Sequence, residues 1–280
     1  MPRITVAIPT YNRVKYLPQA VQSVLDQTFK DFELLIVDNA STDETADIVR
    51  SFKDKRIVYH QNEQNIGMIN NWNRCIDFSK GKYLIILGDD DKLYPNFLEE
   101  SYKTHKLYPN LGFSFSHCNK VDVNGLYLNR WGYDFLPAGY SRGRNYLHYT
   151  VKFGCNLTNS STVLSNKNVF NEVGKFEAEY ATNTFDFNMW IKIAAKFDVY
   201  FIDKVLSDYR IHPDQVSELH WRKNKTGKIG TYLEIYDAIS KLLSNKEYLK
   251  MPGKREFLGR SITEIDKELT RLLKESLPGL

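Results

Sequence analysis

Short apolar runs alternate with amphipathic segments throughout the first hundred residues of this 280-residue chain. The sequence predicts strands at 4–8, 32–37, 56–60 and 82–87, and the run at 32–37 is nearly all apolar, as a strand buried on both faces should be. The segments between them place apolar residues at helical spacing and predict helices at 14–25, 41–52 and 67–78. Strands that alternate with helices in this way form parallel sheets with helices on both faces. We therefore expect an α/β fold with a mostly parallel central sheet.

The pattern changes after residue 110. Short strands are predicted at 113–117, 121–123, 126–128, 161–164, 199–202 and 205–211, and a helix is predicted at 185–197. Asn124 and Gly125 form a pair that is typical of a β-hairpin turn. The polar, glycine-containing stretch 131–145 is expected to be a long loop. This half of the chain therefore predicts a small antiparallel sheet next to the parallel one.

Composition argues against several classes of protein. Lys and Arg number 38 against 34 Asp and Glu, and a net charge of +4 is too small to indicate a nucleic-acid partner. The three cysteines form no CxxC pair, which argues against a zinc ribbon or a disulfide framework and favours a reduced, cytoplasmic setting. The first residues lack the apolar stretch of a signal peptide, and no apolar run approaches the ~20 residues that cross a membrane.

The last sixty residues carry the whole excess of positive charge. Residues 221–280 contain 13 Lys and Arg against 8 Asp and Glu, whereas the rest of the chain is almost neutral. Apolar residues at helical spacing predict two amphipathic helices there, which would form a C-terminal helical extension. Basic amphipathic helices can lie on anionic lipid, but packing against the core or against a second subunit fits the same pattern. All three contacts are open at this point.

Acidic residues follow two of the predicted parallel strands, at the edge where open α/β sheets bind ligands. Asp89, Asp90 and Asp91 come directly after the strand at 82–87, and three adjacent carboxylates predict a divalent cation that bridges to phosphates. A solvated acidic turn is the simpler alternative. Asp38, which follows the second strand, can accept a hydrogen bond from a base or ribose, or it can cap the following helix. The chain has no GxGxxG and no P-loop motif, so metal-bridged phosphates are the more economical way to bind a nucleotide here.

Several motifs together are more specific than any one of them. They are IPTYNR at 8–13, QTFKDFELLIVDNASTDET at 27–45, NIG at 65–67, GKYLIILGDDD at 81–91 and YRIHPDQVS at 209–217. In this order and spacing they resemble the family 2 glycosyltransferases of the GT-A fold, over roughly residues 3–217. The QxxRW motif of the processive members and membrane helices are both missing, so the resemblance is to the non-processive, inverting members. It implies a GT-A domain at 1–220, with a nucleotide-binding half at 1–110 and an acceptor-binding half at 111–220.

The resemblance also implies roles for individual residues. Contacts with the nucleotide sugar are implied for Pro9, Thr10, Tyr11, Arg13, Asp38, Asn65, Gly67, Asn71, Trp72, Asp89 and Asp90. Asp91 and His212 are implied as ligands of the metal, Mn²⁺ or Mg²⁺. Asp186 occupies the place of the catalytic base. The sequence departs from the family at Phe185, where a second acidic residue is usual, and in the helix after NIG, which lacks the usual Arg-Asn pair.

These roles predict a metal-dependent, inverting glycosyltransferase. Its donor is expected to be a UDP- or dTDP-type nucleotide sugar. Its acceptor is expected to be a carbohydrate or lipid-linked glycan at the inner face of the cell membrane, in surface polysaccharide or glycolipid assembly. A nucleotidyltransferase is an alternative, although it usually needs a Gly-rich basic loop that this chain lacks after its first strand. A non-catalytic nucleotide-sugar-binding scaffold is another, because Asp186 is a single carboxylate where the family has two.

Overall fold

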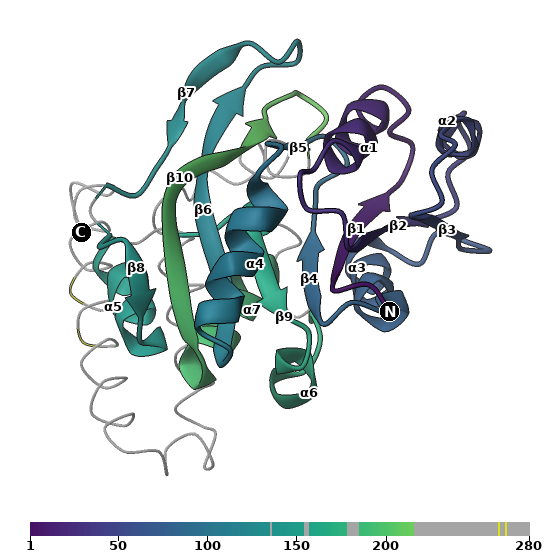
Figure 1. Ribbon diagram of the computed structural model, residues 1–280. Coiled ribbons are helices and arrows are strands. Elements are labelled where there is room, and N and C mark those ends of the chain that lie inside the picture. The colour runs from purple at the N-terminus through teal and green to yellow at the C-terminus, as the bar shows by residue number, and fades with distance from the viewer. Residues whose placement is uncertain (135, 154–156, 178–184, 216–262, 264–266, 268–280) are drawn as a thin grey trace, which may run out of the picture.

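A single mixed sheet organises the described part of the chain (Figure 1). The computed structural model describes residues 1–134, 136–153, 157–177 and 185–215, together with Thr263 and Lys267. Within these residues the sheet has ten strands in the order β3-β2-β1-β4-β9-β6-β10-β5, with β7 paired to β6 and β8 paired to β10. This arrangement confirms the expected α/β fold with a mostly parallel central sheet.

The strands of the sheet are β1 (Ile4–Thr10), β2 (Phe32–Asp38), β3 (Ile57–Gln61), β4 (Tyr83–Ile86), β5 (Lys92–Leu93), β6 (Leu111–Val121), β7 (Tyr127–Trp131), β8 (Gly139–Ser141), β9 (Val163–Asn166) and β10 (Asp198–Arg210). The helices are α1 (Leu17–Leu25), α2 (Thr45–Ser51), α3 (Met68–Phe78), α4 (Phe97–Leu107), α5 (Gly143–Phe153), α6 (Val169–Val173) and α7 (Phe185–Lys196), and the 3₁₀ turn η1 covers Ser160–Thr162. Every residue of β1 and β2 is buried, which explains why these strands are predominantly apolar in sequence.

Helices cover both faces of the sheet. Val6 and Ile8 of β1 belong to a buried apolar cluster with residues of α1, α2 and α4. Ala7 of the same strand belongs to a second cluster, with residues of α3, α5, α6 and α7. Figure 1 shows α4 crossing the sheet on the side that faces the viewer and α7 behind it. Successive residues of a strand point to opposite faces, so each central strand contributes to two apolar layers.

The structure corrects the prediction for the second half of the chain. β6 and β10 are each one long strand, where the sequence pattern predicted two short ones. β10 pairs with β6 in parallel, but the register shifts between Ile202 and Val205 and again between Val205 and Ser207. Asp203 and Lys204 are exposed at this irregularity, so the apolar pattern stops while the strand continues. The antiparallel strands extend the main sheet and do not form the separate small sheet that was expected.

The predicted hairpin after residue 120 is confirmed. β6 and β7 pair antiparallel, and Gly125 in the turn between them has a φ of 85°, which glycine adopts without strain. The carboxylate of Asp122 accepts hydrogen bonds from the backbone N–H groups of Asn124 and Leu126, both at 2.8 Å. An Asn-Gly turn closed by an aspartate side chain therefore joins these two strands.

The stretch 131–145 is not the long loop that its composition predicts. It contains β8, which pairs antiparallel with β10, and the beginning of α5. Gly143 starts α5 in close contact with α7, because a Cβ atom at this position would lie 1.9 Å from the carbonyl oxygen of Ala194. From the sequence alone this glycine indicates a loop, because the helix that it contacts lies much later in the chain.

No helix among the described residues is long and apolar enough to cross a membrane. The two basic helices predicted within 221–280 fall outside the described residues, which in that range comprise only Thr263 and Lys267. The helical extension and the boundary at residue 220 therefore stay predictions.

Candidate functional site

The carboxyl ends of several parallel strands meet at one edge of the sheet. β1 pairs in parallel with β2 and with β4, and β6 pairs in parallel with β10. β9 runs antiparallel to both β4 and β6, so all five of these parallel strands point the same way. Figure 1 shows the arrowheads of β4, β6 and β10 at the same upper edge. This edge collects most of the predicted site residues, where open α/β sheets bind their ligands.

Asp91 lies deepest in the acidic loop, which we define as residues 88–91. Its side chain is buried and both carboxylate oxygens accept hydrogen bonds, from the Ser161 hydroxyl at 2.5 Å and from the Arg210 backbone N–H at 2.9 Å. The Ser161 hydroxyl in turn accepts a hydrogen bond from the backbone N–H of Gly88 at 3.0 Å. Burial and the negative charge of neighbouring Asp90 raise the pKa of Asp91 above its usual range. Asp91 therefore anchors the loop to η1 and β10.

Asp89 and Asp90 lie nearer the surface of the acidic loop. The ring N–H of His212 donates to the Asp90 carboxylate at 2.9 Å, and Arg13 Nε lies 3.8 Å from Asp89 Oδ1. The two carboxylates are 14% and 13% exposed, Asp89 first. Burial and the adjacent charge of Asp90 raise the pKa of Asp89 to about 7. Two close carboxylates of this kind attract a cation, because a positive charge between them removes their repulsion.

The carboxylates of the acidic loop fit a cation that is shared with phosphates better than a metal site made of protein ligands alone. Among the described residues, no three His, Cys, Asp or Glu side chains are grouped as a complete metal site. A Mg²⁺ or Mn²⁺ ion that arrives with a nucleotide needs only one or two carboxylates, because phosphates and water supply its other ligands. Asp89 and Asp90 provide such a pair. The residues present therefore fit a cation carried in with a diphosphate.

The turn after β1 lies beside the acidic loop. Tyr11 is 43% exposed there, whereas Thr10 is buried at the end of the strand with Pro9. Arg13, beside Asp89, also donates to the backbone carbonyl of Asp214 at 3.1 Å, so it joins this turn to the segment after β10. The predicted contacts Arg13, Asp89, Asp90 and His212 are thus brought together by the fold.

Asn12 ties the turn after β1 to the turn after β2. Its backbone N–H donates to the Ser41 hydroxyl at 2.9 Å, and its side-chain oxygen accepts from the backbone N–H of Thr42 at 2.8 Å. Asn12 has a φ of 53°, a conformation that asparagine tolerates better than most residues. These contacts occupy Ser41 and Thr42, and α2 begins at Thr45, later than the predicted start at Ser41.

Asp38 is completely buried at the end of β2. One carboxylate oxygen accepts from the backbone N–H of Ser41 at 2.8 Å and the other from the Tyr59 hydroxyl at 2.5 Å. Its side chain therefore closes the turn after β2 and does not cap α2, which begins at Thr45 with Glu44 at the N-cap position. Contact with a base or ribose stays a prediction for this residue.

Asparagine side chains hold the segment before α3. Asn39 donates to the Asn65 side chain at 2.8 Å, and Asn62 donates to the side chains of Asn39 at 3.0 Å and Asn71 at 2.8 Å. Asn71, which was predicted to contact the nucleotide, is buried and donates to the Val37 carbonyl at 2.9 Å. Asn65 and Gly67 lie in the exposed part of the same segment, and Gly67 has a φ of 84° immediately before α3. This network positions the loop next to β2, and the sequence pattern did not predict it.

Asp186 is the second residue of α7. Its carboxylate accepts a hydrogen bond from the backbone N–H of Phe187 at 2.8 Å, and burial raises its pKa to about 6. The preceding residue, Phe185, packs edge-on against Trp72 with their ring centroids 4.7 Å apart. Trp72, which was predicted to contact the nucleotide, also packs against Phe176 and so links α3 to the start of the helix that carries Asp186.

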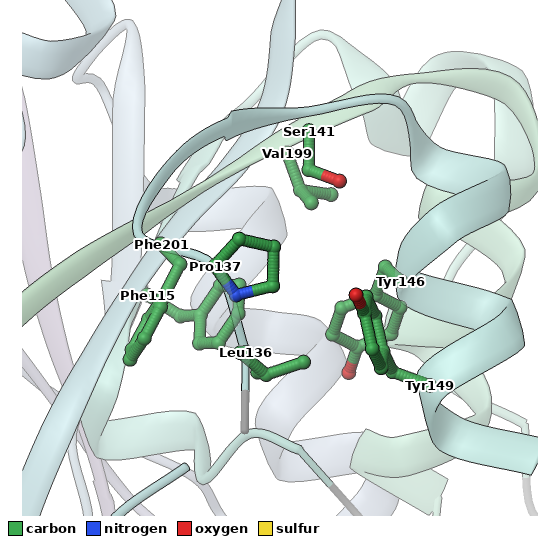
Figure 2. A pocket seen from close by; sticks show the side chains of 8 residues that line it. All are labelled: Phe115, Leu136, Pro137, Ser141, Tyr146, Tyr149, Val199 and Phe201. Carbon is green, nitrogen blue, oxygen red and sulfur yellow. The ribbon is translucent and has the colours of Figure 1, made fainter. Parts of the chain in front are cut away.

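An apolar pocket lies apart from the acidic loop, between α5 and the sheet (Figure 2). It has a volume of about 260 Å³, part of it open to solvent, and its lining residues are Phe115, Leu136, Pro137, Ser141, Tyr146, Tyr149, Val199 and Phe201. Figure 2 shows Tyr146 and Tyr149 of α5 across from the rings of Phe115 and Phe201. None of the carboxylates described above lines this pocket, and all of its lining residues are uncharged.

Comparison with known proteins relates this arrangement to a large family. The sequence model of the family described as "Glycosyl transferase family 2" matches residues 5–160. The chain is 31% identical over 217 residues to the uncharacterized glycosyltransferase MJ1057 of Methanocaldococcus jannaschii, covering 75% of this chain and 71% of that protein. It is 27% identical over 227 residues to the putative teichuronic acid biosynthesis glycosyltransferase TuaG of Bacillus subtilis, covering 80% and 85%. A similar uncharacterized glycosyltransferase of Rickettsia bellii is much longer, because the alignment covers 90% of this chain but only 35% of that protein.

Solved structures share the fold. S. aureus TarS 1–349 in complex with UDP-GlcNAc superimposes with a TM-score of 0.71 at 17% sequence identity, covering 98% of this chain and 73% of the 1–349 chain. The mannosyltransferase PcManGT of Pyrobaculum calidifontis, in complex with GDP-Man and Mn²⁺, superimposes with a TM-score of 0.63 at 16% identity, covering 100% and 76%. At these identities the likeness supports the fold alone.

Proposed function

Because the chain belongs to glycosyl transferase family 2, we propose that it transfers a sugar from a UDP- or dTDP-type nucleotide sugar to an acceptor hydroxyl, non-processively and with inversion. The observation that carries this proposal is the acidic loop at the carboxyl edge of the sheet, where Asp89 meets Arg13 and Asp90 meets His212. Related folds have been solved with UDP-GlcNAc and with GDP-Man and Mn²⁺, which supports a nucleotide sugar as the donor class.

We propose that this chain's own groups bind the donor along the same edge. Tyr11 is exposed for contact with the nucleotide, and Arg13 provides a positive charge close to the expected diphosphate. Asn65 and Gly67 are proposed to line the far side of the nucleotide, on the loop that the buried Asn71 holds in place. Pro9, Thr10, Asp38 and Trp72 are proposed to shape the site from behind these residues.

The proposed cation is Mn²⁺ or Mg²⁺ bound with the diphosphate. Bound there, it supplies a Lewis acid that stabilises the negative charge of the departing diphosphate. Asp91 and His212 were predicted as ligands, and their side chains are engaged with Ser161, Arg210 and Asp90 in this structure. We therefore extend the proposed ligand set to Asp89 and Asp90, whose carboxylates lie nearer the surface.

We propose Asp186 as the base that takes the proton from the acceptor hydroxyl. Its raised pKa of about 6 makes it a stronger base than an exposed aspartate, while leaving it ionised at neutral pH. Only one carboxylate is needed, because a direct displacement with inversion forms no covalent intermediate on the protein. The absence of a second acidic residue at Phe185 is compatible with this route.

The proposal predicts how activity depends on pH. With the donor saturating, kcat/KM for the acceptor is expected to rise with pH through about 6 and to level off above pH 7, because only ionised Asp186 accepts a proton. At pH 5 the value should be about tenfold below the plateau. Donor affinity measured at the same pH values separates this effect from titration of the acidic loop. A flat profile from pH 5 to pH 8 would argue against Asp186 as the base.

A screen of sugar nucleotides tests the proposed function. Thermal shift and donor hydrolysis are measured with UDP-, dTDP- and GDP-sugars in the presence of Mn²⁺, and UTP is included for comparison. Slow hydrolysis of a UDP- or dTDP-sugar supports the glycosyltransferase. Binding without hydrolysis supports the scaffold hypothesis, and preference for the triphosphate supports a nucleotidyltransferase.

We propose a carbohydrate or lipid-linked glycan as the acceptor, in surface polysaccharide or glycolipid assembly at the inner face of the cell membrane. The similarity to a putative teichuronic acid biosynthesis glycosyltransferase supports this class of pathway. The basic residues of 221–280 would bring the protein to anionic lipid, where such an acceptor lies.

The membrane contact predicts a specific loss of binding. Replacing Arg222, Lys223 and Lys225 by glutamine should weaken binding to anionic liposomes about 100-fold, since each basic residue near the surface contributes about 1 kcal/mol. The matched control replaces Lys53, Lys55 and Lys80, which are exposed on the proposed catalytic part, and should change little. Equal liposome binding by both triple variants would contradict the membrane role of 221–280.

A further inference from the structure

Arg210, the last residue of β10, is a positive charge buried inside the protein. Its side chain is only 1% exposed. The acceptors that its guanidinium reaches among the described residues are all uncharged: three backbone carbonyls and one side-chain amide. Burying a guanidinium without a direct carboxylate partner is costly, so the contacts that it makes in the interior need an explanation.

Two groups of Arg210 hold two successive residues of the acidic loop. Its side-chain Nε donates to the backbone carbonyl of Asp90 at 2.9 Å, and its backbone N–H donates to the carboxylate of Asp91 at 2.9 Å. The Asp90 carbonyl and the Asp91 carboxylate are thereby fixed toward β10. The Asp90 side chain is then left to meet His212, at 2.9 Å. Arg210 therefore constrains the orientation of the loop from the side of β10.

The other end of the guanidinium reaches separate elements. One terminal nitrogen donates to the carbonyls of Asp122 and Val123, at 3.1 and 3.2 Å, in the turn between β6 and β7. The other donates to the Gln19 side chain of α1 at 2.9 Å. The guanidinium carbon lies 5.1 Å from the centre of the Tyr16 ring. A planar group with several fixed donors can join these elements at once, whereas a lysine ammonium reaches fewer of them.

We propose that Arg210 is a positioning residue for the cation and diphosphate of the donor: it fixes the acidic loop so that Asp90 presents its carboxylate in one orientation. This inference rests on the proposed function. The role differs from general support of the fold, because the other contacts of Arg210 serve stability whereas the contact with Asp90 serves binding. The two roles can be separated by substitutions.

The test measures UDP binding by calorimetry across a range of Mn²⁺ concentrations, together with melting temperatures. Arg210→Met should weaken Mn²⁺-dependent UDP binding about 10–100-fold, as loss of a residue behind a metal ligand generally does. Arg210→Lys should lose less UDP binding than Arg210→Met, because lysine keeps a positively charged donor but not the planar guanidinium with several donors. Gln19→Ala removes one distant contact of the guanidinium and leaves the bond to Asp90, so it should keep UDP binding within about twofold of the wild type.

Several results would overturn the proposal. Folded Arg210→Met with the wild-type dependence of UDP binding on Mn²⁺ is one of them. Should Arg210→Met fail to melt cooperatively, Arg210→Lys decides, and unchanged binding there overturns the proposal as well. If Gln19→Ala and Arg210→Lys both lose UDP binding in proportion to their loss of melting temperature, the role of Arg210 is purely structural. Absence of UDP and dTDP binding by the wild-type protein would contradict the proposed function itself, whatever the variants show.

Discussion

Replacing Asp186 by asparagine is expected to lower the rate of sugar transfer by about 10²–10⁴-fold while leaving donor binding unchanged. Asparagine keeps the shape of the side chain and an oxygen that can accept the hydrogen bond from the Phe187 backbone N–H. It cannot take a proton from the acceptor. Transfer rate and UDP affinity, measured on the same preparation, separate the loss of the base from a loss of binding.

The stability of this variant provides an independent check. The folded-state pKa of Asp186 lies above its ordinary value of 3.8, at about 6. The folded state therefore favours the protonated carboxyl, and this contribution to stability is lost as the pH rises through about 6. At neutral pH the uncharged asparagine should melt no lower than the wild type. Asp203→Asn, at an exposed carboxylate on β10, is the matched control and should keep activity. Asp186→Asn with wild-type transfer would remove Asp186 from the mechanism.

Replacing Asp90 by asparagine is expected to reduce kcat/KM by about 10²–10³-fold and to abolish the effect of Mn²⁺ on UDP binding. The Asp90 carboxylate is the partner of His212 and lies near the surface of the acidic loop. Asparagine retains an oxygen for the histidine but loses the negative charge that attracts a cation. Calorimetry with UDP, in the presence and absence of Mn²⁺, measures this loss directly.

The control for Asp90 lies on β10. Asp208 accepts a hydrogen bond from the Tyr94 hydroxyl at 2.8 Å, two residues before Arg210. Asp208→Asn makes the same change of charge near this edge of the sheet and should leave the dependence on Mn²⁺ intact. A similar loss in both variants would indicate a general effect of charge on the site and would contradict a specific role for Asp90.

The parallel half of the sheet could be predicted from the sequence because each of its strands has a recognisable local pattern. β1 and β2 are buried over their whole length, so each appears as a largely apolar run next to an amphipathic helix. The Asn124-Gly125 turn could be predicted for the same reason, since its backbone conformation depends on those residues. β10 could not be read as one strand, because its register shifts around Val205 expose Asp203 and Lys204 within it.

The site could be predicted only in part. Acidic residues that follow a strand indicate a ligand edge, so the position of Asp89 and Asp90 at that edge could be predicted. The contacts that orient them come from residues far apart in the chain, such as Ser161 and Arg210, and no local pattern reveals such partners. Arg210 lies within the motif YRIHPDQVS, so its presence was visible while its contacts were not. The asparagine network around Asn62 was hidden in the same way.

Inverting transfer with Asp186 as the base is tested by following donor hydrolysis by ¹H NMR with Mn²⁺ and an α-linked UDP- or dTDP-sugar. Water then takes the place of the acceptor, and the first anomer released is read before it equilibrates. Inversion releases the nucleoside diphosphate together with the β-anomer, and Asp186→Asn is expected to release neither. The α-anomer as the first product would contradict inversion, and equal hydrolysis by Asp186→Asn would contradict the assigned base.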